Sequence, residues 1–412
     1  MDSAEHNEPW PRGRTNHYLF DLNRDWFAQT QPEIRAHAKA FLEWMPVAFV
    51  DAHEMGSDST YFFAPEAEPY NPFITAEQRA SLIMFGKTNA KRFDHFGIDY
   101  FTREVFDAFF PGYGASWPIY HGAIAMTYEQ ASARGLIATR YDGSQFSYAE
   151  TVRNHFVASL ATIETVASNR QKLLQQFYEY RRSAIEIGSK GKTKSYIFAN
   201  EPGSDAGFIM ARSLSQQGIE VRQSLEDFRV CGQSFDAGSY FLNLDQPASR
   251  LIQTLLEEQV DLPADFLRQE AERSEKRQAS QIYDVTAWSL PLMYGVKTNN
   301  CARLVTAKSE AITDTSTWRT TTPLDQAQLA YLVPWGSHAS GLFLTKALRA
   351  GVHIKSSNVA FTHQQRRYGR GTLIINVHNN DAGIHDVVQR LATETGAEVV
   401  SVDDSWGSDG PN

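Results

Sequence analysis

The stretch Val47-Ala48-Phe49-Val50-Asp51-Ala52-His53 decides how the first part of this chain is read. Four apolar residues in an unbroken row are typical of a strand that is buried on both faces of a sheet. A histidine follows this row at its carboxyl end, and ligands of open α/β sheets bind at the carboxyl ends of the strands. We therefore predict a core strand that places the His53 imidazole at a functional edge.

A second strand and three helices are predicted around the first strand. Residues Ala123–Tyr128 form another short apolar run, and Glu129 follows it directly. The helices are indicated by a proline in a first turn, by the capping-box pair Thr75 and Gln78, and by apolar residues at helical spacing. These predicted helices are Pro32–Trp44, Thr75–Phe96 and Tyr148–Ile187. The chain should thus bring an imidazole and a carboxylate to the ends of two core strands.

Composition excludes several classes of protein. The net charge of −9 over 412 residues gives no general attraction for nucleic acid. No row of eighteen apolar residues occurs, so we expect no membrane span. The first residues, Met1–Trp10, are polar and acidic, unlike a signal peptide. Two cysteines, Cys231 and Cys301, make no disulfide framework, although a single bridge between them stays open.

The second half of the chain is predicted to be an α/β module built on an internal repeat. Gly188–Lys194 is rich in glycine and lysine and reads as a flexible linker. Beyond it, residues 195–265 and 330–400 each read strand, helix, strand, strand, helix. We therefore divide the chain into residues 1–187, a linker at 188–194, and an accessory module at 195–412.

Two adjacent side chains near the start of the chain suit an anion. Asn23 and Arg24 follow an apolar strand and offer hydrogen-bond donors in a fixed fork, which fits a carboxylate. The alternative is a surface arginine that pairs with Asp21 or Asp25. This feature alone does not decide between the two.

Neither His53 nor Glu129 is specific by itself. A histidine after a core strand is more often a satisfied structural residue than a ligand. A glutamate at a strand end can be solvated or paired with Arg134. A catalytic base would instead lie in a dry site with a shifted pKa.

Taken together, these motifs resemble the zinc carboxypeptidases, the carboxypeptidase A-like metallopeptidases, of a bacterial multidomain type. Arg14 followed by Asp21-Leu22-Asn23-Arg24 is similar to the family's arginine and Asp-Leu-Asn-Arg signature, and Thr127-Tyr128-Glu129 is similar to its Thr-x-Glu. His53 falls where the family's third zinc ligand stands, and Gly112–Trp117 looks like the stretch before the catalytic glutamate. The resemblance covers about residues 1 to 170 and implies a partial carboxypeptidase-like mixed sheet with flanking helices.

The resemblance implies roles for the substrate-binding residues. Asn23 and Arg24 would hold the terminal carboxylate of a peptide substrate. Arg14 would stabilise the oxyanion that forms on the scissile carbonyl. Tyr113, with Tyr120 as the next candidate, would be the tyrosine that closes over the substrate.

It also implies a zinc site that this chain does not complete. His53 would bind zinc, oriented by Asp51, and Glu129 would take a proton from zinc-bound water. The family's other two ligands come as His-x-x-Glu, which occurs nowhere in this sequence. One imidazole does not hold zinc tightly. We therefore expect a chain cut at both ends, with a missing N-terminal segment as its partner and neighbours absent beside the Val47–Val50 strand.

The sequence thus predicts a zinc metallocarboxypeptidase fragment, inactive alone. The alternative is a pseudopeptidase that binds C-terminal peptides or carboxylates, and a third reading is a fragment that does not fold by itself. Relatives of this kind are secreted or periplasmic, but the chain shows no export signal, so the sequence leaves its compartment open.

Overall fold

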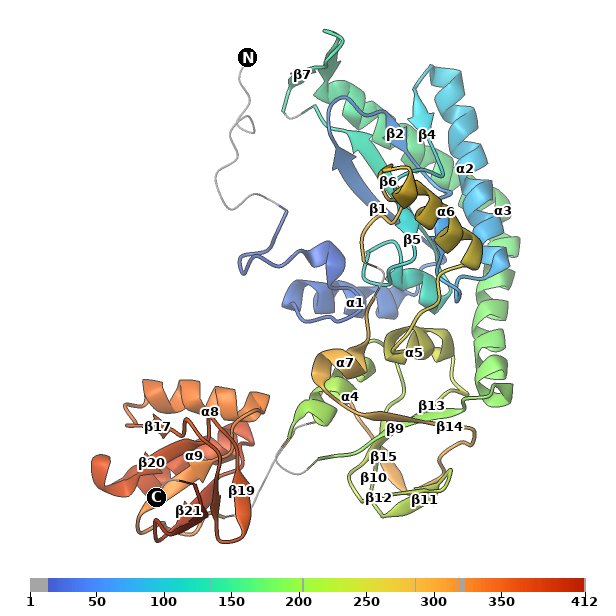
Figure 1. Ribbon diagram of the computed structural model, residues 1–412. Helices are drawn as coiled ribbons and strands as arrows, with labels where there is room; N and C mark the ends of the chain where they lie inside the picture. The colour runs from blue at the N-terminus through green and yellow to red at the C-terminus, as the bar shows by residue number, and fades with distance from the viewer. Residues whose placement is uncertain are drawn as a thin grey trace.

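The computed structural model describes residues 14–133, 135–201, 204–285, 287–316, 318 and 323–410. The polar start Met1–Trp10 and the proposed partner Arg134 lie outside these residues. Within them the protein is a mixed α/β structure with several small sheets (Figure 1). Of the helices in these ranges, none is long and apolar enough to cross a membrane.

The first part of the chain forms a four-stranded mixed sheet in the order β1-β6-β2-β4. Strands β1 and β6 are parallel, β2 runs antiparallel to β6, and β4 runs parallel to β2. The elements are α1 (Pro32–Trp44), β1 (Ala48–Met55), β2 (Tyr61–Phe62), β3 (Ala67–Tyr70), α2 (Ala76–Phe96), β4 (Tyr100–Phe101), β5 (Asp107–Ala108), β6 (Ile124–Ala131), β7 (Ile137–Thr139), β8 (Gln145–Ser147) and α3 (Tyr148–Lys190). Two short 3-10 turns, η2 (Leu22–Arg24) and η3 (Trp117–His121), complete this part.

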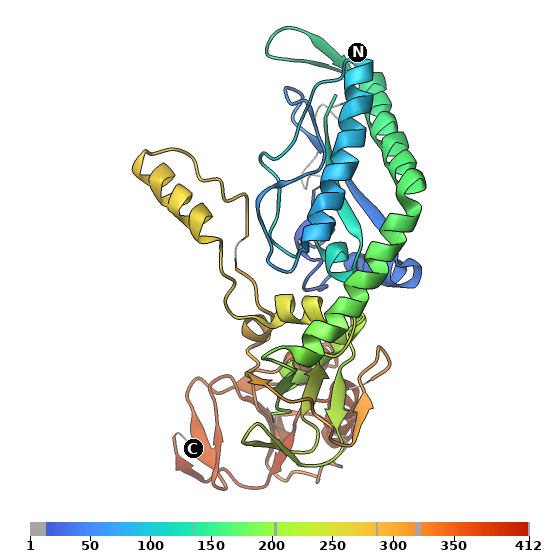
Figure 2. The same cartoon turned by 90° about the vertical axis from the view of Figure 1, so that its right-hand side faces the viewer.

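The helices α2 and α3 lie side by side on one face of the sheet (Figures 1 and 2). Both begin at capping boxes, Thr75 with Gln78 and Ser147 with Glu150, which satisfy the first free backbone N–H groups. Their inner faces bury Phe85, Val157 and other apolar side chains against the sheet. The helix starts expected from sequence are confirmed.

The first strand is longer than expected. Pairing with β6 continues in register from Ala48 to Met55, which keeps the backbone extended beyond the apolar run. His53 therefore lies inside β1 rather than after it. In the described part of the chain no strand pairs with the outer side of β1, so this strand is the edge of its sheet.

The expected flexible linker at Gly188–Lys194 is largely wrong. Helix α3 continues through Gly188 to Lys190, so only the last residues of that stretch form a loop. Gly188 is buried against Leu244, and a Cβ at this position would lie 1.6 Å from the Leu244 carbonyl oxygen. A large core also joins the two parts, because Phe41 and Trp117 pack in one cluster with Phe198 and its neighbours.

The remaining chain forms two α/β units; in each, a strand and a helix are followed by four short strands and a second helix, and the second unit adds two further strands. The first contains β9 (Ser195–Phe198), α4 (Ala206–Gln216), β10 (Arg222–Ser224), β11 (Phe228–Val230), β12 (Gln233–Phe235), β13 (Tyr240–Asn243) and α5 (Ser249–Leu256). The second contains β16 (Ala330–Val333), α8 (His338–Arg349), β17 (Lys355–Ser356), β18 (Phe361–His363), β19 (Arg366–Tyr368), β20 (Leu373–Asn376), η4 (Val377–Asn379), α9 (Ile384–Thr395), β21 (Val400–Val402) and β22 (Gly407–Asp409).

Each unit has one main sheet. The sheets have the orders β14-β9-β13-β10-β15 and β17-β20-β16-β21, so the first strand of each unit pairs with the strand before its last helix. Between the units lie α6 (Ala264–Glu275), α7 (Leu290–Tyr294), β14 (Thr298–Cys301) and β15 (Ser309–Ala311). A disulfide joins Cys231 to Cys301, which settles the bridge that the sequence left open.

Candidate functional site

His53 and Glu129 lie next to each other on the neighbouring strands β1 and β6 of the first sheet. They are register partners in the parallel pairing of β1 with β6. Partners in neighbouring strands of a sheet present their side chains to the same face, with the backbones about 4.8 Å apart. The imidazole and the carboxylate that the sequence suggested therefore share one face.

The Asn23 side-chain amide connects several parts of this site. Its Nδ2 atom lies 3.1 Å from Asp51 Oδ2 and 2.9 Å from His53 Nε2, and its Oδ1 atom accepts the Gly114 N–H at 2.6 Å. The turn η2 holds Asn23 in place, because the backbone N–H of Asn23 donates to Asp21 Oδ1. A Cβ at position 114 would lie 2.7 Å from Asp51 Oδ2, so this close approach requires glycine.

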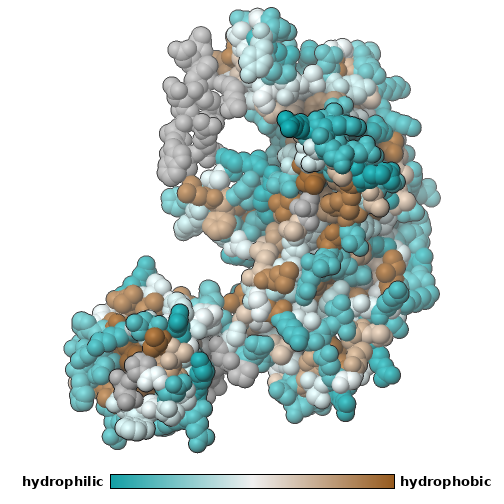
Figure 3. Space-filling model, viewed as in Figure 1, coloured by the Kyte–Doolittle hydropathy of each residue, from teal (hydrophilic) through white to brown (hydrophobic). Residues whose placement is uncertain are grey.

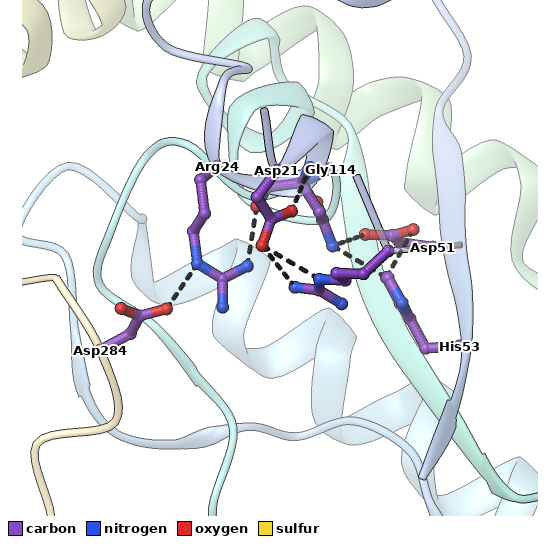
Figure 4. A network of polar contacts seen from close by, with 8 residues as sticks. Asp21, Arg24, Asp51, His53, Gly114 and Asp284 are labelled. Carbon is purple, nitrogen blue, oxygen red and sulfur yellow. Dashed lines mark hydrogen bonds and ion pairs between the residues drawn. The ribbon is translucent and has the colours of Figure 1, made fainter. Parts of the chain in front are cut away.

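His53 is oriented by Asp51, as the resemblance implied. The Nε2 atom lies 2.9 Å from Asp51 Oδ1, and Figure 4 shows the two side chains together. This nitrogen can donate to Asp51 or accept from Asn23, but not both at once. Burial lowers the pKa of His53, but the hydrogen bond and charge of Asp51, with the charge of Glu129, raise it overall. The hydrogen bond between Nε2 and Asp51 is thus one cause of the raised pKa.

Glu129 has the environment of a proton acceptor. Burial raises the pKa of its carboxyl group to about 7, and the charge of Asp51 acts in the same direction. His53 and Arg14 act in the opposite direction. A carboxyl group with a pKa near neutral pH is suited to general acid–base chemistry.

The two arginines of the motif are held differently. Arg14 pairs with Asp21, with Nε and Nη2 each 3.0 Å from Oδ2, and its side chain is 53% exposed. Arg24 pairs with neither Asp21 nor Asp25, so that alternative is wrong. Its Nε atom instead donates to Asp284 at 2.5 Å, and its Nη1 atom donates to the Asn23 carbonyl oxygen at 2.9 Å (Figure 4).

The tyrosines expected to close over a substrate do not stand free in the site. Tyr113 is buried, and the Arg24 guanidinium carbon lies 4.7 Å from the centre of its ring. The Tyr113 ring therefore packs against the Arg24 guanidinium. Burial raises the pKa of the Tyr113 hydroxyl. Tyr120 is completely buried in the core. The exposed tyrosine beside this group is Tyr283, whose ring centre lies 6.1 Å from that of Tyr113.

Asp284 and Tyr283 are the site residues that the sequence did not indicate. They belong to the segment between the two α/β units; Asp284 contacts Arg24, and Tyr283 contacts Phe106 and Tyr113. No motif marks them.

The described residues do not complete a zinc site. His53 and Asp51 are adjacent, but no group of three or more His, Cys, Asp or Glu side chains in the described ranges is arranged to hold a metal ion. His53 Nε2 is engaged by Asp51. Catalytic zinc takes three protein ligands, so these residues alone do not fit it.

Comparison with known proteins gives a limited result. No family model matches the chain, and no curated protein matches its sequence. Among solved structures, the chain is similar to a metallo-carboxypeptidase from Burkholderia cenocepacia, with a TM-score of 0.30 and 21% sequence identity. The match covers 38% of this chain and 40% of that chain, less than half of either. This is a partial resemblance in fold and assigns no activity.

Proposed function

We propose that the site around Arg24 binds a free carboxylate at the end of a peptide, as a carboxypeptidase-type recognition site. The observation that carries this proposal is that Arg24 already holds a carboxylate, that of Asp284. Arginine suits this role because its planar guanidinium presents several donors in a fixed geometry.

The surroundings of Arg24 support the same function. Its side chain is 26% exposed, so it is reachable from solvent but partly dehydrated. The ring of Tyr113 and the carbonyl oxygen of Asn23 fix its orientation. A fixed, partly buried cation loses little freedom when it binds an anion, which favours affinity.

A second candidate is the zinc metallocarboxypeptidase itself. It is favoured by the pairing of His53 with Glu129 and by the raised pKa of Glu129, about 7. Zinc would require further donors beyond those of the described residues. Peptide hydrolysis by this chain alone is therefore not part of the proposal.

The binding proposal is tested by fluorescence anisotropy with a fluorescein-labelled tripeptide, used once with a free C-terminal carboxylate and once as its amide. We expect the acid to bind more tightly than the amide. Arg24→Ala should weaken binding of the acid about ten- to a hundredfold, the range for losing a charge-assisted hydrogen bond. Arg92→Ala is the matched control, since Arg92 pairs with Glu164 on the helices α2 and α3. Equal binding of acid and amide would contradict the proposal.

The zinc candidate has a separate test. The metal content of the purified protein is measured by mass spectrometry, with His53→Ala as the comparison. About one zinc per chain that is lost in the variant would support the hydrolase, and carboxylate binding unchanged by a chelator would favour recognition without metal.

The second half of the chain supports two further parts of the proposal. The equal order of elements in the units that begin at β9 and β16 supports an internal repeat with an accessory role. The bridge between Cys231 and Cys301 supports an oxidising compartment, outside the cytosol, because such bonds persist there. Alkylation of the natively produced protein without reductant would test the latter, and two free thiols would contradict it.

A further inference from the structure

We propose that the segment containing Tyr283 and Asp284 is an intramolecular ligand of the carboxylate site, so that an incoming peptide must displace it. This inference rests on the proposed function, because it takes Arg24 as the residue that binds the peptide carboxylate. It adds that the second half of the chain regulates access to the site.

The contacts of this segment reproduce those of a bound ligand. Asp284 Oδ2 accepts a hydrogen bond from Arg24 Nε at 2.5 Å, and the two side chains are 30% and 26% exposed. The neighbouring Tyr283 ring lies 5.4 Å from Phe106 and 6.1 Å from Tyr113, measured between ring centres. A carboxylate and an aromatic side chain from an extended segment thus occupy the site together.

This segment belongs to an arm that is weakly attached. The arm consists of α6 and the chain up to residue 285, and Figure 2 shows it projecting away from the rest of the protein. Helix α6 buries only one of its side chains, that of Phe266. In Figure 3 the outer surface of this helix is hydrophilic.

A cavity separates the arm from the first part of the chain. It has a volume of about 1120 Å³ and is lined by Phe266 and Tyr283 on the arm, and by Tyr70 and Arg79 opposite. Helix α6 itself buries little apolar surface, so moving this helix away costs little hydrophobic free energy. Near the site the arm is held by the ion pair between Asp284 and Arg24 and by the ring contacts of Tyr283 with Phe106 and Tyr113.

Competition follows from this arrangement. Arg24 offers its Nε edge to one carboxylate at a time, so a peptide carboxylate binds only when Asp284 has left. The apparent dissociation constant is then the intrinsic constant divided by the fraction of protein in which the arm is displaced. Removing the charge of residue 284 should raise this fraction and tighten binding.

The test uses the full chain and the same labelled tripeptide acid and amide. Asp284→Asn keeps the size of the side chain and removes its charge, and we expect the acid to bind about two- to fivefold more tightly, the range of a partly exposed ion pair. Asp265→Asn is the matched control, because it removes the same charge from the arm at a side chain that pairs with Arg268. In an Arg24→Ala background, Asp284→Asn should change nothing.

The outcomes separate this inference from the proposed function. If Arg24→Ala weakens binding but Asp284→Asn leaves it at the wild-type level, the intramolecular ligand is refuted while carboxylate recognition stands. If Arg24→Ala leaves binding of the peptide acid unchanged, the proposed carboxylate recognition is refuted, and the intramolecular ligand with it. As a second measurement, saturating peptide acid should speed tryptic cleavage of the arm at Arg273 and Arg277, and an unchanged cleavage rate would count against displacement.

Discussion

Glu66 makes the stability of this protein depend on pH. Glu66 is 5% exposed, and burial raises the pKa of its carboxyl group from 4.5 to about 7. Hydrogen bonds from Tyr70 and from the Thr127 backbone lower this pKa but do not offset burial, and the charge of Asp107 raises it further. The protonated form therefore fits the folded protein better than the charged form.

The sign and size of the effect follow from linkage. The folded protein binds this proton more tightly than the unfolded chain, so protonation favours folding. The stability it contributes is complete below about pH 4.5 and is lost as pH rises through about 7. A shift from 4.5 to about 7 corresponds to about 3 kcal/mol in total, of which about 2 to 3 kcal/mol falls between pH 5 and 8.

Urea unfolding at pH 5 and pH 8 measures this effect. Glu66→Gln keeps an acceptor for Tyr70 and Thr127 but does not titrate. The free energy of unfolding of this variant, minus that of the wild type, should rise by about 2 to 3 kcal/mol between the two pH values. Other titrating groups are shared and cancel in the difference. Glu68→Gln, an exposed change two residues away, should give no such rise. Parallel pH curves for Glu66→Gln and the wild type would refute the reasoning.

Two further predictions concern close packing at glycine and the disulfide. Gly188→Val should destabilise the protein by about 3 kcal/mol or more in urea melts, because its Cβ would overlap the Leu244 carbonyl oxygen. Gly341→Ala, where no atom lies within 4 Å of the new Cβ, should be neutral or stabilising by about 1 kcal/mol; comparable losses in both variants would contradict the packing argument. Reducing the Cys231–Cys301 bridge, which spans 70 residues, should lower the free energy of unfolding by up to about 4 kcal/mol, and an unchanged melt in reductant would show that the bridge does not constrain the unfolded chain.

The local elements of the fold could be predicted from the sequence because their signals are local. Helix α1 has the predicted bounds, Pro32–Trp44, and α2 begins after its capping residue Thr75. Caps, prolines and apolar spacing act within a few residues. We expected His53 and Glu129 to be adjacent because each follows a predicted core strand. In the structure they are adjacent because they are register partners in the pairing of β1 with β6.

What failed depends on contacts between distant residues. The partner of Arg24 is 260 positions away, and nothing near Asp284 in the sequence marks it. Tyr113 was expected to meet substrate, but a tyrosine under a guanidinium and one in a pocket look alike in sequence. Glycines at 188 and 191 suggested flexibility, whereas Gly188 is needed for close packing.

Helix α3 couples the stability of the two halves of the protein. Its first half packs on the sheet that carries His53, and its last turn packs beside Leu244 in the next unit. Severing the chain within this helix would strip the covering from both hydrophobic interiors, so neither product should survive as a soluble, cooperatively melting species. The proposed carboxylate site and the arm proposed to regulate it would then be lost together.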